Sequence, residues 1–148
     1  MQLSEQLARA FAAMGRLLNE HSGTEVLSRP DFAVLIRLPR AQEVAAGAEE
    51  VRPRDLARTE GLDPSTMSRR LASLASRGLI HRETDPTDGR AQMLFLTEEG
   101  HRAVTQERAR RVTLVTDALQ GWDEADTAEL ARLLGRLTDT LGASGSTS

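Results

Sequence analysis

The stretch from Val51 to Thr97 reads VRPRDLARTEGLDPSTMSRRLASLASRGLIHRETDPTDGRAQMLFLT, and it decides the fold. Its pattern predicts two short helices and then two strands. Gly61-Leu62 supplies the tight turn between the helices. A turn-rich loop over residues 85–90 separates strand-like segments at 79–84 and 91–96. Two helices and a hairpin in this order predict a winged helix-turn-helix.

The second helix of this pair is predicted to run from Pro64 to Arg77. Asp63 suits the N-cap, and a proline at the first helical position removes no hydrogen bond that the helix needs. Gly78 suits the position just past the end. Three apolar residues at helical spacing form one stripe that faces a core: Met67, Leu71 and Leu74.

The outward face of that helix carries hydroxyl groups and arginines and no acid. Small hydroxyls allow a helix to approach base edges closely, and an arginine can bind guanine through two hydrogen bonds. A solvated helix face usually mixes both signs of charge, so this face predicts an anionic partner. The alternative is a polar surface without a ligand. The face includes Ser65, Thr66, Ser68, Arg69, Arg70, Ser76 and Arg77.

Composition bounds the function further. The 148 residues have a net charge of −3, yet the segment from Arg52 to Arg90 holds eight arginines against six acids. Cysteine is absent, which excludes disulfides and thiolate zinc sites, and we expect no cofactor or metal. No apolar run approaches the roughly 20 residues that span a bilayer, and no secretory signal opens the chain, so we expect a cytoplasmic protein.

The quoted stretch resembles the multiple-antibiotic-resistance regulator (MarR) family of bacterial transcription factors. The resemblance rests on Leu56-Ala57, the run from Ser65 to Arg82, Asp88-Gly-Arg90 and Leu96-Thr-Glu-Glu-Gly100. It implies a homodimer of mainly α-helical winged-helix subunits that binds palindromic operators, often with a small-molecule effector. One departure is the connection over residues 39–50, which is longer than usual and whose alanines allow an extra helical turn.

Amphipathic helices are predicted on both sides of the winged helix. Residues 1–20 carry a seam of Leu3, Leu7, Phe11, Met14 and Leu18, and Ser28 opens a second helix whose apolar residues are Phe32, Leu35, Ile36 and Leu38. Residues 98–141 hold two more helices, capped by Thr97 and Asp123. We therefore expect one domain over 1–141, with 1–20 and 98–141 forming the dimer, and a disordered tail over 142–148. The alternative is that these helices cover one core within a monomer.

The resemblance gives each polar residue an expected role on duplex DNA. Ser65, Thr66, Ser68 and Arg69 would face base edges in the major groove, while Arg54, Arg70 and Arg77 would lie near phosphates. Arg90 at the wing tip would enter the minor groove. Asp88 would orient Arg90 through a short ion pair, or would be an ordinary turn acid; both interpretations stay open.

A sequence-specific repressor is the function that the resemblance leads us to expect, and two other functions are alternatives to it. An enzyme is disfavoured because His21, His81 and His101 are far apart in the sequence, and no nucleophile or phosphate-binding motif is present. A winged helix that binds a protein partner, or that coats DNA without sequence preference, would have the same fold. Effector contacts are not assigned; Met14, Phe32 and His21 are candidates that serve equally as core or helix-end residues.

Overall fold

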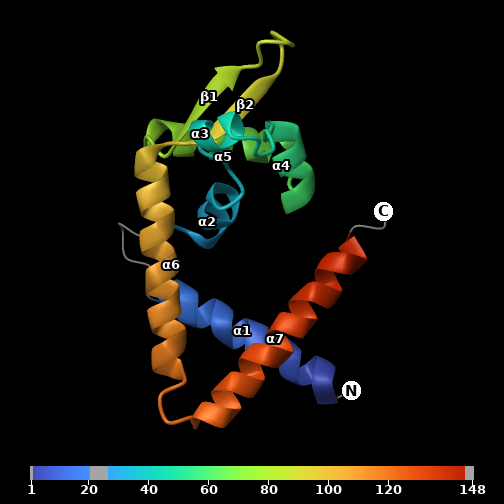
Figure 1. Cartoon of the computed structure of the whole chain (residues 1–148), viewed down its shortest axis with the longest axis vertical. Helices are drawn as coiled ribbons and strands as arrows, with labels where there is room; N and C mark the ends of the chain where they lie inside the picture. Colours follow the sequence, from blue (N-terminus) through green and yellow to red (C-terminus); the bar gives the residue numbers. More distant parts are fainter. Residues whose placement is uncertain (1, 21–26, 146–148) are drawn as a thin grey trace. The chain divides into compact units, whose positions relative to one another are not determined.

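The computed structural model describes residues 2–20 and 27–145. Its elements follow the order shown in Figure 1: α1 (Gln2–Glu20), α2 (Arg29–Leu35), α3 (Ala41–Ala45), α4 (Pro53–Glu60), α5 (Pro64–Ser76), β1 (Ile80–Thr84), β2 (Gln92–Leu96), α6 (Glu98–Ala118) and α7 (Glu124–Gly145). The chain divides into two compact units, one up to Arg111 and one from Val112 onward. The mainly helical fold with one antiparallel hairpin is confirmed.

Helix α5 begins at Pro64 as predicted and ends at Ser76, one residue before the predicted end, with Arg77 as its C-cap. The Asp63 carboxylate accepts a hydrogen bond from the backbone N–H of Thr66 at 3.0 Å, and Pro64 occupies the first turn. Gly78 follows the helix with φ of 72°, a left-handed conformation that costs glycine little. Met67, Leu71 and Leu74 are buried. The opposite face of α5 is therefore free for other contacts.

The hairpin is antiparallel and pairs Ile80 with Leu96 and Thr84 with Gln92. It projects past α4 and α5 (Figure 1). The backbone on either side of α3 also bonds to β2, because the N–H of Leu94 donates to the carbonyl of Val51 at 2.9 Å and that of Leu96 donates to Pro39 at 2.8 Å. The long connection thus contains the extra helical turn and also holds the base of the wing.

One core unites α2, α4, α5, the hairpin and the start of α6. It includes Leu35, Leu56, Leu71, Leu94 and Val104, all buried. Burial of large aliphatic side chains is worth about 1.5–3 kcal/mol each, so this core fixes α5 against the other elements. Ile36 departs from expectation: it is 42% exposed, because α2 ends at Leu35 and the chain then turns.

Gly100 permits α6 to start directly against the segment that joins α5 to β1. A Cβ at this position would lie 2.0 Å from the carbonyl oxygen of Leu79 and 2.8 Å from the Leu96 side chain. The Thr97 hydroxyl caps α6 by accepting from the N–H of Gly100 at 3.0 Å, and it donates to the carbonyl of Gly78 at 2.6 Å. Only a residue without a side chain fits this junction.

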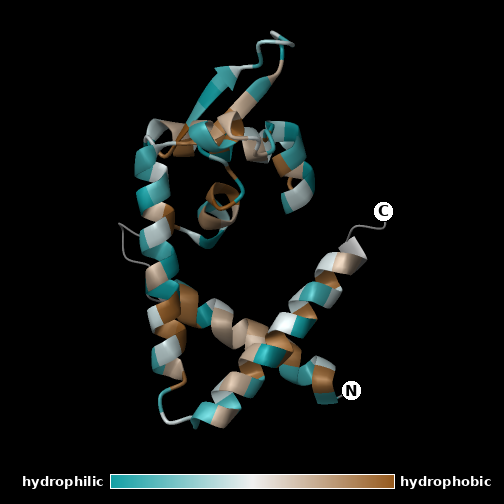
Figure 2. Cartoon of the chain, viewed as in Figure 1, coloured by the Kyte–Doolittle hydropathy of each residue, from teal (hydrophilic) through white to brown (hydrophobic). Residues whose placement is uncertain are grey.

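The flanking helices follow their predicted ranges with one difference. Asp123 caps α7 as expected, accepting from the N–H of Asp126 at 2.7 Å. However, α7 continues to Gly145, so residues 142–145, which we expected to be disordered, are helical. Figure 2 shows apolar bands on α1 and on α7, each considered alone, and a mostly polar first half of α6. The described helices include none that is long and apolar enough to cross a bilayer.

Candidate nucleic-acid interface

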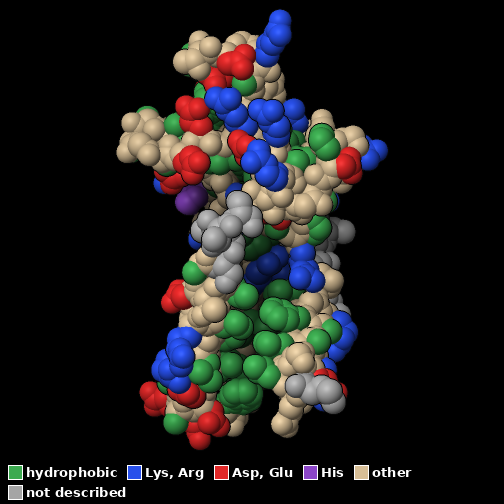
Figure 3. Space-filling model, turned by 90° about the vertical axis from the view of Figure 1, so that its right-hand side faces the viewer, with side chains coloured by type: hydrophobic (Ala, Val, Ile, Leu, Met, Phe, Trp, Pro, Cys, Tyr) green, Lys and Arg blue, Asp and Glu red, His purple; other side chains and the backbone are tan. Residues whose placement is uncertain are grey.

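The exposed face of α5 presents the four residues expected to read bases. Ser65, Ser68 and Arg69 are exposed, and Thr66 is half-buried. Within the described part of the chain, no acid pairs with the Arg69 guanidinium, which leaves its donors available. Figure 3 shows arginine side chains gathered on the surface of the winged helix.

Two of the hydroxyls on this face are already engaged. Ser65 Oγ and Thr66 Oγ1 both donate to the carboxylate of Asp63. These hydrogen bonds, with the one from the Thr66 backbone, hold the pKa of Asp63 well below its usual range. Because each hydroxyl proton points at Asp63, the oxygens of Ser65 and Thr66 remain available as acceptors. They suit donors such as the amino groups of cytosine and adenine.

Arg70 and Arg77 both pair with one carboxylate of the protein itself. Arg70 Nη1 donates to Asp31 Oδ1 at 3.1 Å, and Arg77 Nη1 donates to Asp31 Oδ2 at 2.9 Å. Asp31 lies in the first turn of α2 and its side chain is only 16% exposed, while Arg77 is 42% exposed. Both guanidinium groups thus have a counter-charge within the protein, and the phosphate contacts expected for them stay a prediction. No sequence spacing signals this arrangement, because Asp31 precedes Arg70 by 39 residues.

Arg54, for which we predict a phosphate contact, is exposed in the first turn of α4. Together with Arg58 and Arg82 it borders a hollow between α4, α5 and β1 whose apolar lining includes Met67 and Leu71. An exposed arginine at a helix start beside the recognition helix can bind a DNA phosphate without a large movement.

The wing tip is organised by two aspartates. Asp88 Oδ1 accepts from the backbone N–H of Arg90 at 3.1 Å, so Asp88 shapes the turn, and the ion pair with the Arg90 guanidinium is not observed. Asp85 is buried, and hydrogen bonds from the Thr87 hydroxyl and backbone N–H, at 2.7 and 2.8 Å, lower its pKa. Arg52 also binds Asp85. Arg90 is left exposed at the end of the hairpin.

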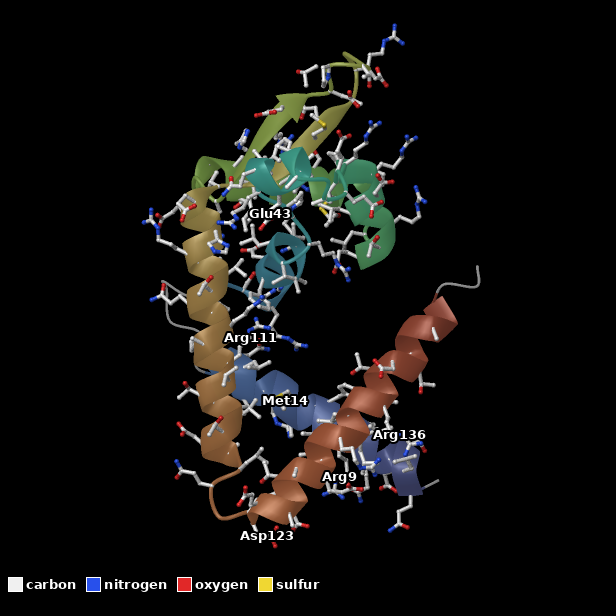
Figure 4. The ribbon with its side chains drawn as sticks, in the orientation of Figure 1. Arg9, Met14, Glu43, Arg111, Asp123 and Arg136 are labelled. Atoms are coloured by element: carbon white, nitrogen blue, oxygen red, sulfur yellow. The ribbon has the colours of Figure 1, made fainter. Side chains whose placement is uncertain are left out.

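A buried ion cluster in α6 was not anticipated. Glu107 is 3% exposed and accepts from Arg110 and Arg111 at 2.8 and 2.7 Å. Burial alone would raise the pKa of Glu107, but these two hydrogen bonds outweigh it and the pKa is lowered. Arg111 also lies 3.9 Å from the centre of the Phe32 ring, and Figure 4 shows it directed from α6 toward α2. The i, i+3 and i, i+4 spacing could have indicated these pairs.

The structure describes two of the three candidate effector residues. Phe32 is buried beneath Arg111, and Met14 is 40% exposed on α1. His21 lies outside the described residues. No group of acids and histidines suited to a metal ion occurs within 2–20 and 27–145. On β1, His81 stacks on Phe95 with ring centres 5.2 Å apart, and its side chain is 44% exposed.

Comparison with known proteins shows similarity to one family over part of the chain. Residues 27–91 match the model described as MarR family. The uncharacterized HTH-type transcriptional regulator YxaD of Bacillus subtilis is 31% identical over 86 residues, which cover 58% of this chain and 60% of YxaD, so the chain spans less than two thirds of that relative.

Solved structures agree with the match in sequence. Wild-type MarR from E. coli, in its apo form, superposes with a TM-score of 0.71 at 22% identity, covering 93% of this chain and 97% of that one. PcaV from Streptomyces coelicolor, solved in complex with its natural ligand, gives a TM-score of 0.56 at 28% identity, covering 93% and 89%. The curated relatives are described as transcriptional regulators of the helix-turn-helix type. With its capped α5 and arginine-tipped wing, the chain has the winged helix-turn-helix fold of these structures, and its residues 27–91 are similar to the MarR family.

Proposed function

We propose that the protein is a homodimeric repressor that binds an inverted-repeat operator. The observation that carries this proposal is the acid-free exposed face of α5, in which Ser65, Ser68 and Arg69 lie opposite the buried stripe of Met67, Leu71 and Leu74. In the major groove, Arg69 would donate to guanine, and Ser65 and Thr66 would accept from base amino groups.

Two further arginines fix the helix on the duplex. Arg54 binds a phosphate beside the major groove, and Arg90 enters the adjacent minor groove, whose negative potential attracts a guanidinium. Asp88 sets the backbone of the turn that carries Arg90. Two-fold symmetry then requires recognition helices about 34 Å apart, one turn of DNA, and hence an operator that is an inverted repeat.

Dimerisation is supported by apolar surface on two helices. Leu3 and Phe11 on α1 are 74% and 68% exposed, and Leu133, Leu134 and Leu141 on α7 are also exposed. Hydrophobic side chains in such number on amphipathic helices are typical of an interface. A second copy of the chain would cover them in an isologous contact.

Sedimentation tests the dimer. The wild type should sediment as a dimer at micromolar concentration. Phe11→Glu should shift it toward the monomer because the substitution places a charge in the apolar face of α1. Gln6→Glu, an exposed polar position on the same helix, is the matched control and should stay dimeric. A monomeric wild type would contradict the dimer.

Release by a small molecule is the last part of the proposal. One support is a surface pocket lined by Asn19, Arg29, Phe32 and Arg111, in which an aromatic ring lies near two cationic side chains. The other is that PcaV was solved in complex with its natural ligand. An anionic aromatic compound would suit this lining. Titration of such compounds into the operator complex should lower its affinity if the pocket controls binding.

Competition binding tests the function itself. A regulator should prefer its operator over random duplex by at least about 10³-fold at physiological salt. DNA upstream of the coding region is the first sequence to test. Equal affinity for both duplexes would instead indicate a protein that coats DNA, and no affinity for either would indicate a module that binds a protein partner.

A further inference from the structure

Asp31 joins the recognition helix to α2 at two separate points. Each oxygen of its carboxylate takes one guanidinium: Oδ1 accepts from Arg70 at 3.1 Å and Oδ2 accepts from Arg77 at 2.9 Å. The backbone N–H of Asp31 in turn donates to the Ser28 hydroxyl at 3.2 Å, which holds the first turn of α2. The group of Asp31, Arg70 and Arg77 is called the Asp31 clamp below.

The clamp is part-buried, and Arg77 is the more exposed of its two arginines at 42%. The side chains of Asp31 and Arg70 are 16% and 23% exposed, and Arg70 Nε is buried without a hydrogen-bond partner among the described residues. A part-buried cation needs its counter-charge. If the counter-charge is removed, the cation stays partly shielded from water and has no ionic partner in its place. Asp31 is therefore what allows Arg70 to stay in this position.

The clamp lies next to the residue that we expect to contact a base. Arg70 directly follows Arg69, the exposed arginine expected to bind guanine, and Arg77 is the C-cap of α5. The two anchors are seven residues apart, about 10 Å along a helix axis. Two points of attachment on one flank prevent α5 from rolling about its axis, and such a roll would move Arg69 away from a fixed base.

We propose that Asp31 is a positioning residue that determines the operator specificity of the recognition helix, although it does not touch DNA. The proposal rests on the proposed function. Asp31 fixes the orientation in which Arg69 meets the bases, and it withholds Arg70 and Arg77 from contacts with phosphates, which carry no sequence information. Removal of the Asp31 charge should thus weaken specific binding and strengthen non-specific binding.

Asp31→Asn is the informative substitution because it keeps the shape and removes the charge. Without the carboxylate, Arg70 and Arg77 are free to reach phosphates. Each new phosphate contact steepens the dependence of log K on log salt by about 0.9. Affinity for random duplex should therefore rise at low salt. The loss of a fixed orientation should lower the operator-to-random affinity ratio by about tenfold, the effect of one lost base contact.

The experiment measures binding to operator and to random duplex across a salt series, together with the thermal midpoint of each variant. Asp31→Glu keeps the charge and should retain most of the ratio. Arg70→Gln in the wild type should lower the ratio without changing the salt slope. The control is Glu99→Gln, which removes the same charge from an exposed pair with Arg102 and should change neither quantity.

The outcomes separate the proposals. If Asp31→Asn only lowers the thermal midpoint, with the ratio and the slope of the folded protein unchanged, the clamp has a purely structural role and the proposal is wrong. An equal loss of both affinities, or a shallower slope for Arg70→Gln, also overturns it. A wild type without operator preference would contradict the proposed function itself, which is a distinct result.

Discussion

Gly100→Ala should destabilise the winged helix, because the added Cβ meets backbone. It would lie 2.0 Å from the carbonyl oxygen of Leu79, while carbon atoms ordinarily stay beyond 3.0 Å, so the start of α6 has to move by about 1 Å. Overpacking of this kind costs about 1–3 kcal/mol. The shift also strains the bond from the Thr97 N–H to Leu79, now 3.1 Å and worth about 1 kcal/mol.

Alanine has the better helix propensity, which returns about 1 kcal/mol. We therefore expect a net loss of about 1–3 kcal/mol in the free energy of unfolding. For an m-value of about 2 kcal/mol/M, the urea midpoint should fall by about 0.5–1.5 M.

The assay is urea unfolding followed by circular dichroism, with all variants at one protein concentration because a dimer unfolds in a concentration-dependent manner. Gly135→Ala is the matched control: it makes the same exchange inside α7, where no atom lies within 4 Å of the new Cβ. The control should keep or raise the midpoint. A Gly100→Ala midpoint equal to the wild type would refute the reasoning.

Three other predictions concern DNA and pH. Arg69→Ala should cost about 1–3 kcal/mol on the operator and relax the preference at one base position, as measured by binding to a set of single-base operator variants. Arg90→Ala should weaken binding to all sequences with little change in preference and make the salt slope shallower by about 0.9; if both variants bind as the wild type does, the docking is wrong. Asp63, Asp85 and Glu107 all have lowered pKa values, so the stability they contribute is present above pH about 4–5 and is lost as pH falls through the folded-state pKa. The urea midpoint should stay level from pH 7 to about pH 5 and drop as the pH falls from about 5 to about 2.5, and the drop should be smaller in Asp63→Asn than in the wild type.

The local structure of the winged helix was predictable because its signals are local. Asp63, Pro64 and Gly78 mark the ends of α5 through short-range rules, and the spacing of Met67, Leu71 and Leu74 fixes its buried face. Gly61, with φ of 63°, similarly identifies the turn before it. The extra turn in the long connection followed from its alanines.

Side-chain partners across the fold were not predictable from the sequence. A helical wheel places Arg70 and Arg77 on the flank of α5, but only tertiary structure shows that Asp31 reaches that flank. The interaction of Asp88 with the backbone of Arg90, in place of its guanidinium, depends on the conformation of the turn. The role of Gly100 likewise depends on how closely Leu79 approaches.

The most direct test of the central claim is a hydroxyl-radical footprint of the protein on its operator. Two copies of the α5 face, held by a two-fold dimer, should protect two half-sites about 10 bp apart in a symmetric pattern, with Arg90 protecting the flanking minor groove. Loss of one half-site should abolish the symmetric pattern. A single protected site, or uniform protection along any duplex, would contradict the account.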